Sequence, residues 1–250
     1  MNLSEIVEGI PETALLYQGD SYLTEFKASV LRVVREKKSS VYLVLDKTLF
    51  HPKSGGQPSD RGVISGLNFE VKVKKALFSK KVVVHYGKIL QGEPREGEVH
   101  GSIDWDWRYL LMKRHTAGHL MDHCITITTG RWAETTDSWL GDTCYVGYRG
   151  EGLSEEQIKE VEELVRERIR EGAPVKVEYV SLEELKRRAP HAPNIYRLPT
   201  LESYRIVTIK GCSPIPCGGT HLRNINEIKD FKITDQTIVE SGFRVYYKVV

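Results

Sequence analysis

Two pairs of metal-binding residue types, each with three residues between its members, constrain how this 250-residue chain can fold. The first pair is His115 and His119, and the second is Cys217 and His221. Residues four apart on a helix lie on one face, one turn apart, so both imidazoles of the first pair can reach a single ion. If all four residues bind that ion, two segments about a hundred residues apart must meet in the fold.

The residue types of the two pairs favour zinc over packing as their explanation. Cysteine and histidine are the side chains that Zn²⁺ prefers in proteins. A single H-x-x-x-H would more often be two packed or exposed histidines, since spacing alone does not make a site. Two matched pairs are harder to assign to packing. We therefore predict one Zn²⁺ per chain, held by His115, His119, Cys217 and His221.

The residues next to these pairs bear on the chemistry. Helical metalloproteases place a glutamate directly after the first histidine, and Thr116 stands there, which disfavours a peptidase. Gly218 and Gly219 follow Cys217, and glycines allow close approach of the backbone and present N–H groups that could stabilise an oxyanion. A tight turn explains the two glycines equally well, and the two interpretations are compatible.

The first hundred residues read mainly as short strands separated by Gly, Pro, Ser and Asp. Segments 22–35 and 40–46 are rich in β-branched and aromatic residues, and in segment 69–73 apolar residues alternate with Glu70 and Lys72. Alternation with a period of two is the signal of a half-buried strand. This pattern predicts a small antiparallel β-barrel over residues 1–103.

The character of the chain changes near Asp104. We expect residues 104–130 to be helical, at least from about residue 115 onward, and we expect a second helix that opens with a Ser154–Gln157 capping box and ends at Gly172. Strands are predicted at 175–181, 204–210, 228–234 and 243–249. Residues 104–250 thus read as an α/β domain with an antiparallel-rich sheet, which makes the whole chain α+β.

Composition and charge exclude several classes of protein. The formal net charge of +2 gives no strong bulk attraction to nucleic acid, although a local basic surface remains compatible with it. The N-terminus lacks the pattern of a signal peptide, and no apolar run approaches the ~20 residues that span a bilayer. We therefore expect a cytoplasmic location without membrane attachment, and no disulfide framework among the four cysteines.

Three motifs together carry a family resemblance. These motifs are His115-Thr-Ala-Gly-His-Leu120, Cys217-Gly-Gly-Thr-His221, and an N-terminal segment in which Phe50-His-Pro52 precedes Gly55-Gly-Gln57 and Asp60-Arg-Gly62. They resemble the editing domain of alanyl-tRNA synthetase and its free-standing relatives, the AlaX proteins. The resemblance extends from about residue 45 to 225 and points to the medium-length AlaX-M type, in which a barrel precedes the editing domain. Gly118 departs from the family, which usually has a larger residue there.

The resemblance implies an aminoacyl-tRNA hydrolase that acts in trans. Its substrate would be mischarged tRNA(Ala), chiefly Ser-tRNA(Ala) with Gly-tRNA(Ala) as the second candidate, and the four ligands would bind the Zn²⁺ that assists ester hydrolysis. A site built for alanine cannot strongly reject serine or glycine by binding alone, so a second, hydrolytic site is needed. Beyond the zinc ligands, no catalytic residue is assigned. The residues expected to contact the substrate are Gly55, Gly56, Gln57, Thr136, Gly218 and Gly219.

Two of these assignments have plain structural alternatives. Thr136 could recognise the serine hydroxyl, or it could be an ordinary strand threonine. Gly55-Gly56-Gln57 also occurs as a tripeptide in release factors, but three residues are too few for that inference, and a hairpin turn beside Pro58 explains them as well. For phosphate contacts the sequence offers lysines around one hairpin, or an ordinary solvated face; these lysines are Lys72, Lys74, Lys75, Lys80 and Lys81.

Two other functions remain open at the level of sequence. One is a non-catalytic tRNA-binding module with a structural zinc, since four protein ligands close a tetrahedral site. The other is a zinc hydrolase of small esters or amides with the barrel as an accessory domain.

Overall fold

The structure, a computed structural model, describes residues 2–192, 195, 198 and 200–250. The chain divides into two compact units, Met1–Tyr109 and Leu110–Val250. Both units contain antiparallel sheets, and helices accompany them, so the predicted α+β class is confirmed. The predicted assignment of separate roles to residues 1–103 and 104–250 stays a prediction.

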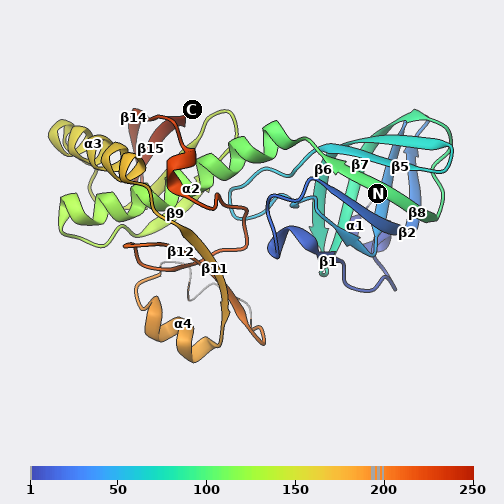
Figure 1. The fold of residues 1–250 in the computed structure, drawn as a ribbon, viewed down its shortest axis with the longest axis horizontal. Coiled ribbons are helices and arrows are strands. Elements are labelled where there is room, and N and C mark those ends of the chain that lie inside the picture. Colours follow the sequence, from blue (N-terminus) through green and yellow to red (C-terminus); the bar gives the residue numbers. More distant parts are fainter. Residues whose placement is uncertain (1, 193–194, 196–197, 199) are drawn as a thin grey trace. The chain divides into compact units, whose positions relative to one another are not determined.

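A closed barrel of antiparallel strands forms the first unit, with the strand order β2-β3-β7-β6-β5-β8 (Figure 1). This confirms the barrel that was predicted from the short alternating strands. The strand bounds are β2 (Glu25–Lys37), β3 (Ser40–Leu45), β5 (Gly62–Gly66), β6 (Phe69–Ser79), β7 (Val82–Gln91) and β8 (Gly97–Ile103).

Alternation along β6 shows why these residues form a barrel. Phe69, Val71 and Val73 are buried and belong to the core that fills the barrel, whereas Lys72 between them is exposed. Apolar side chains on one face and charged ones on the other give a strand one buried side, which fixes its register. Outside the barrel, α1 (Leu3–Ile6) contributes to a smaller apolar cluster with Val44 and Val84.

Short elements complete the first unit. A two-residue parallel pair joins β1 (Ala14–Leu15) to β4 (Lys47–Thr48), and the 3₁₀ helix η1 (Leu16–Gln18) follows β1. The segment between β4 and β5 holds the Gly-Gly-Gln tripeptide.

Helix α2 (Trp105–Thr129) occupies the segment 104–130 that was predicted to be helical at least from about residue 115. Asp104 sets the start of this helix, because its carboxylate accepts the N–H of Trp107 at 3.2 Å and its carbonyl accepts the N–H of Arg108. An aspartate in this position caps the free N–H groups of a first helical turn. Among the described residues, no helix is both long and apolar enough to cross a membrane.

Two antiparallel sheets belong to the second unit. One has the order β14-β15-β10-β9 and the other β11-β12-β13. The strand bounds are β9 (Thr135–Trp139), β10 (Tyr145–Arg149), β11 (Val175–Val180), β12 (Tyr204–Ile209), β13 (Ile215–Pro216), β14 (Phe231–Val239) and β15 (Gly242–Val249). The strand predicted at 228–234 thus starts later and runs further, because the 3₁₀ helix η3 (Ile225–Glu227), capped by Asn224, occupies the preceding residues.

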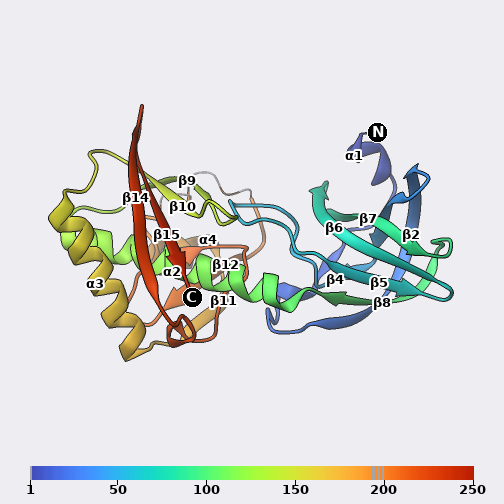
Figure 2. The same cartoon turned by 90° about the horizontal axis from the view of Figure 1, so that it is seen from above.

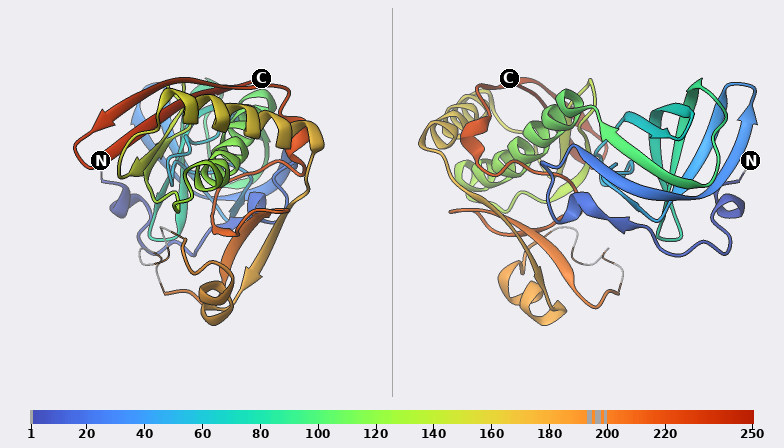
Figure 3. Two further views of the ribbon diagram at one scale, coloured as in Figure 1. Left: turned by 90° about the vertical axis from the view of Figure 1, so that its left-hand side faces the viewer. Right: turned by 45° about the vertical axis from the view of Figure 1, so that its right-hand side comes forward.

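Two helices cover these sheets, and both begin where a serine caps them. In α3 (Glu155–Glu171) the predicted capping box of Ser154 and Gln157 is present, and Gly172 ends the helix with φ 72°. Its apolar stripe is buried, and the helix contacts β14 (Figure 2). In α4 (Leu182–Arg188) the Ser181 hydroxyl accepts the N–H of Glu184, and the helix packs against β12 (Figure 3).

Candidate metal centre

The fold brings the two predicted residue pairs together within the second unit. His115 and His119 lie one turn apart on α2, and Cys217 and His221 lie in the loop that follows β13. The ligand atoms that these four residues offer all lie within 4.8 Å of one another. The residues that were predicted to meet from two distant segments therefore do meet.

Distances within the cluster suit a single tetrahedral ion. Sγ of Cys217 lies 3.4 Å from Nε2 of His115 and 3.2 Å from Nε2 of His221. With the usual zinc–sulfur and zinc–nitrogen bond lengths, a tetrahedral site separates such ligand atoms by about 3.5 Å. The donor set of one thiol and three imidazoles is one that zinc favours. The residues present therefore fit a bound Zn²⁺.

Burial shifts the proton equilibria of the cluster. Desolvation, with a smaller contribution from the positive charge of Arg205, lowers the pKa of His119 to about 4. His119 is therefore a neutral imidazole near pH 7, the form that binds metals. Burial raises the pKa of the Cys217 thiol, while the N–H of Gly219, 3.4 Å from Sγ, and the charge of Arg205 favour the thiolate. A divalent cation would complete that charge balance.

Thr116 holds the third histidine of the cluster, His221, in place. Its hydroxyl lies 3.2 Å from Nδ1 of His221 and accepts the backbone N–H of Leu222 at 3.1 Å. The side chain of Thr116 is fully buried, and His221 is 4% exposed. Because Nδ1 is engaged by Thr116, Nε2 is the nitrogen that faces Cys217. Sequence reasoning used Thr116 to argue against a peptidase and missed this contact, because nothing in the pattern revealed which residue would meet His221.

Gly118, the departure from the family pattern, lies on α2 between the two histidines. A Cβ atom at this position would come within 2.9 Å of the Tyr247 hydroxyl. That hydroxyl donates a hydrogen bond to the carbonyl of Arg114 at 2.8 Å, which joins β15 to the turn that carries His115. A larger residue at 118 would push Tyr247 away from this carbonyl.

A second titratable group on the same helix was not found by sequence reasoning. Asp122 lies three residues beyond His119, and its carboxylate accepts a hydrogen bond from the Tyr148 hydroxyl at 2.6 Å. Desolvation raises the pKa of Asp122 to about 7, although the bond from Tyr148 opposes the shift. Positions three and four apart on a helix are neighbours, so this carboxyl borders the face that carries the metal cluster. Nothing in the sequence pattern singled out this aspartate, because its helical neighbours include both polar and apolar residues.

The Gly-Gly-Gln tripeptide forms a tight turn in the first unit, as the hairpin interpretation predicted. Ser54 and Gln57 exchange backbone hydrogen bonds, with N···O distances of 2.9 and 3.2 Å. Gly55 and Gly56 have φ values of 53° and 79°, which glycine adopts at no steric cost. The Gln57 side chain is fully buried. Contact of this turn with a substrate stays a prediction.

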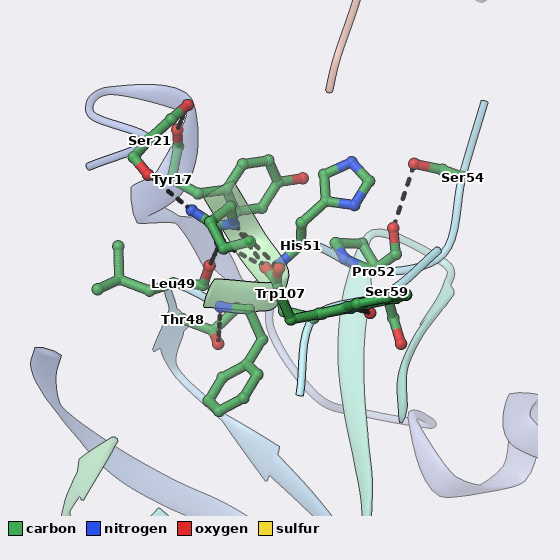
Figure 4. Close-up of polar contacts among 12 residues, drawn as sticks. Tyr17, Ser21, Thr48, Leu49, His51, Pro52, Ser54, Ser59 and Trp107 are labelled. Carbon is green, nitrogen blue, oxygen red and sulfur yellow. Dashed lines mark hydrogen bonds and ion pairs between the residues drawn. The ribbon is translucent and has the colours of Figure 1, made fainter. Parts of the chain in front are cut away.

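A buried ion pair anchors the segment that carries this turn. Arg108 and Asp60 are both fully buried, and the guanidinium of Arg108 forms a short salt bridge with the Asp60 carboxylate. The guanidinium also donates to the carbonyl of Leu49 at 2.6 Å, and the Asp60 carboxylate accepts the N–H of His51 at 2.6 Å (Figure 4). Trp107 donates its indole N–H to the carbonyl of Ser59 at 3.1 Å. The Asp60 side chain of the third motif thus holds the segment between β4 and β5 in place.

The remaining predicted substrate contacts stay predictions. Thr136 lies on β9 and donates a hydrogen bond to Asp137 at 3.3 Å. Its hydroxyl lies against Gly147 of the neighbouring strand, where a Cβ atom would come within 3.0 Å. Gly218 is exposed and has open space around the position of a Cβ atom. The N–H of Gly219 is already directed at the sulfur of Cys217.

Comparisons with protein families match both units of the chain. Residues 18–107 match the family of class II tRNA synthetases (A). Residues 204–246, which include Cys217 and His221, match the threonyl and alanyl tRNA synthetase second additional domain.

Individual relatives agree with these family matches over most of the chain. The alanyl-tRNA editing protein AlaX-M of Methanosarcina acetivorans is 34% identical over 249 residues, which cover 95% of this chain and 99% of the relative. The AlaX-M protein of Methanosarcina barkeri is 33% identical with the same coverage. The alanine–tRNA ligase of Pyrococcus abyssi is 32% identical over 95% of this chain, which corresponds to 26% of the ligase.

Proposed function

We propose, because the chain belongs to the AlaX-M family of alanyl-tRNA editing proteins, that it deacylates mischarged tRNA(Ala) in trans. The proposed substrates are Ser-tRNA(Ala), chiefly, and Gly-tRNA(Ala). The observation that carries the proposal is the cluster of one thiol and three imidazoles, which two motifs of the resemblance bring together. The bond broken is the ester between the amino acid and the terminal ribose of the tRNA.

The choice of serine and glycine follows from the limits of binding selectivity. A hydrophobic site that accepts alanine rejects an isostere with one extra hydroxyl by only about a hundredfold. A glycine, which is smaller, cannot be excluded by size. A second site that hydrolyses the wrong ester supplies the missing discrimination. A hydroxyl group that hydrogen-bonds serine would favour it over alanine, and Thr136 is the proposed residue.

The proposed cofactor is one Zn²⁺ held by His115, His119, Cys217 and His221. Bound there, Zn²⁺ supplies positive charge that can polarise an ester carbonyl or orient the amino acid. The chain contributes neutral imidazoles, since burial keeps His119 unprotonated near pH 7. Gly218 offers an exposed backbone beside the cluster, where its N–H can meet a developing oxyanion.

A second candidate function is favoured by the number of donors. Four protein ligands close a tetrahedral zinc site, whereas catalytic sites keep a position open. The contact of Thr116 with His221 fixes the fourth donor rather than leaving it loose. This arrangement favours a structural zinc in a non-catalytic tRNA-binding module. The two functions differ in one measurable respect, because the module would bind the mischarged tRNA without releasing its amino acid.

The deciding experiment measures release of serine from Ser-tRNA(Ala) by the zinc-loaded protein. We expect rapid release of serine and slow release of alanine from Ala-tRNA(Ala) under the same conditions. If the zinc-loaded protein binds tRNA(Ala) but releases neither serine nor glycine, the non-catalytic module is correct and the hydrolase is not.

A cysteine pair supplies a matched control for this experiment. Cys217→Ser removes the sulfur donor of the cluster, and we expect it to abolish most serine release and to lower bound zinc. Cys212→Ser makes the same chemical change five residues earlier, at a partly buried free cysteine outside the cluster. We expect it to leave both zinc content and activity near those of the unchanged protein. Equal loss in both variants would show that the effect is not specific to the cluster.

The turn at Gly55-Gly56-Gln57 in the first unit is proposed to contact the acceptor end of the tRNA. Gln57→Ala tests this, provided that its melting temperature is measured alongside, because the side chain is buried. The substrate is made by a synthetase in the cytoplasm, so we propose that the protein acts there.

A further inference from the structure

Four lysines on the outside of the barrel have no partner of opposite charge among the residues that the structure describes. Lys72, Lys74 and Lys75 of β6 and Lys88 of β7 are exposed. Within the part of the chain that the structure describes, none of their side chains forms a hydrogen bond or an ion pair. Some other cations of the same unit are paired, as Arg35 is with Glu93, Arg61 with Asp104 and Lys81 with Glu12.

The strand register places two of these lysines directly opposite each other. Lys72 pairs with Lys88, and Lys88 pairs on its other side with Ser40 of β3. Ser40 in turn pairs with Lys37 of β2, so one row across four strands carries three lysines. Two like charges that lie directly opposite each other destabilise a sheet by up to about 1 kcal/mol. The fold tolerates this repulsion although either position could carry a neutral side chain.

A bulge in β6 adds a further positive charge to the same face. The pairing of β6 with β7 shifts between Val73 and Lys75, so β6 has an extra residue there. Val73 and Ala76 are buried, and Lys74 and Lys75 between them are both exposed. Without the bulge, strand alternation would have turned one of two successive lysines inward. The bulge in β6 thus directs the side chains of both Lys74 and Lys75 outward.

Two tyrosines stand in the next row of the same face. Tyr86 pairs with Lys75 on one side and with Tyr42 of β3 on the other. Their ring centroids are 5.0 Å apart, and both hydroxyls donate hydrogen bonds to Glu36, at 2.8 and 2.9 Å. Both tyrosines are partly exposed. The Glu36 carboxylate at the edge of this face therefore accepts hydrogen bonds from the two tyrosines and, among the described residues, forms no ion pair with the four lysines.

We propose that this lysine–tyrosine face, made of Lys72, Lys74, Lys75, Lys88, Tyr42 and Tyr86, binds the phosphate backbone of the tRNA. The inference rests on the proposed function for the identity of the RNA. Adjacent strands are ~4.8 Å apart and alternate residues of one strand are ~7 Å apart, so the face presents a two-dimensional array of cations to a polyanion. Aromatic rings beside such cations are typical of surfaces that bind RNA.

The weak net charge of the chain makes a local array the physically relevant feature. With a formal net charge of +2, the molecule as a whole attracts RNA little. The four lysines outnumber the nearby carboxylates of Glu70 and Glu36, so this face carries a net local positive charge. Each phosphate contact of this kind releases counterions, so the affinity should fall steeply with salt.

The test is the salt dependence of binding to uncharged tRNA(Ala), which involves no chemistry. The variant Lys72→Gln/Lys75→Gln/Lys88→Gln is compared with the unchanged protein in KCl titrations. Each lost phosphate contact lowers the slope of log affinity against log salt by about 0.7–0.9, so we expect a slope shallower by about 2. At low salt we expect binding to be about tenfold to a hundredfold weaker.

A matched control removes the same charge elsewhere. Lys27, Lys159 and Lys232 are exposed and lie outside the face, and their triple change to glutamine should leave slope and affinity within twofold of the unchanged protein. The melting temperature of the face variant should not fall, since the change removes the repulsion between Lys72 and Lys88. Equal weakening in both triple variants, or an unchanged slope in the face variant, would refute the proposal.

Turnover separates this inference from the proposed function. On Ser-tRNA(Ala) the face variant should show a raised KM and an unchanged kcat, because the face lies outside the metal cluster. If the unchanged protein releases no serine, the proposed hydrolase fails while the binding measurement still decides whether the face holds tRNA.

Discussion

The hydroxyl of Thr116 lies 3.2 Å from Nδ1 of His221, and it joins the two motifs that are 105 residues apart. The same oxygen accepts the N–H of Leu222, so one buried side chain orients both the ring and the backbone of the second motif. A histidine whose Nδ1 is fixed in this way presents Nε2 to a metal.

Removing this hydroxyl should weaken metal binding without removing a ligand. In Thr116→Val the shape is kept and the hydrogen bonds are lost, so His221 is free to rotate. Loss of such an outer contact typically lowers metal affinity about 10–100-fold. Competition with a chromophoric zinc chelator measures it, and Thr116→Ser should recover most of the affinity. Unchanged affinity in Thr116→Val would show that Thr116 serves packing alone.

The four ligands should contribute comparably to zinc affinity. His221→Ala and His115→Ala each remove one imidazole, and we expect each to weaken zinc binding more than Thr116→Val does, because a direct bond is lost. Metal content after dialysis and competition titration give the comparison. If His221→Ala retains full affinity while His115→Ala does not, His221 is not a ligand and the site has an open position.

The carboxyl of Asp122 should make stability depend on pH in an unusual direction. Its folded pKa is raised from 3.8 to about 7, so the folded state holds a proton that the unfolded state releases. Stability from this group is therefore present below pH 4, falls as pH rises, and is lost above pH 7.

Asp122→Asn keeps an acceptor for the Tyr148 hydroxyl and removes the titration. We expect it to stabilise the protein by about 1–3 kcal/mol at pH 8, which is less than the full pKa shift would give because the side chain is partly accessible to solvent. Near pH 4 the carboxyl is largely protonated in the folded state, so the substitution should have little effect. Urea denaturation at the two pH values measures the difference. A variant that is equally stable or destabilised at pH 8 would show that the carboxylate is compensated in the folded state.

Breaking the buried ion pair of the first unit should be costly. Asp60→Asn leaves the guanidinium of Arg108 buried without its carboxylate, and such a loss typically destabilises by about 3–5 kcal/mol. Denaturant titration monitored by tryptophan fluorescence measures this loss of stability, since the indole N–H of Trp107 is hydrogen-bonded to the carbonyl of Ser59 in the same segment. As a comparison, Arg61→Gln removes an exposed salt bridge with Asp104 and should cost less than about 1 kcal/mol.

Much of the fold could be predicted because local rules agreed with the tertiary structure. Alternation in residues 69–73 predicted a strand with one buried side, and Ser154 with Gln157 predicted the start of a helix. Helix α2 lies where a helix was predicted, but its start was bounded only by residue 115, because the sequence pattern did not show that Asp104 caps the first turn. The late start of β14 depends on the 3₁₀ helix at Ile225–Glu227, whose capping by Asn224 was overlooked.

The meeting of His115, His119, Cys217 and His221 could be predicted because the types and spacing of these residues carry chemistry. What surrounds them could not, since the contacts of Thr116 with His221 and of Asp122 with Tyr148 depend on where distant segments meet. Gly118 is a further position whose surroundings could not be predicted from the sequence. Its lack of a side chain is explained by Tyr247, which lies more than a hundred residues later in the chain.

The distance of 102 residues between His115 and Cys217 has a consequence during synthesis. A chain that has grown past α2 carries two imidazoles and lacks the sulfur and the third ring. Metal capture therefore cannot precede translation of the loop after β13, whatever the state of the barrel. A nascent or truncated chain that ends before that loop would lack two of the four residues of the cluster, so retention of an ion by all four would report that synthesis has passed His221.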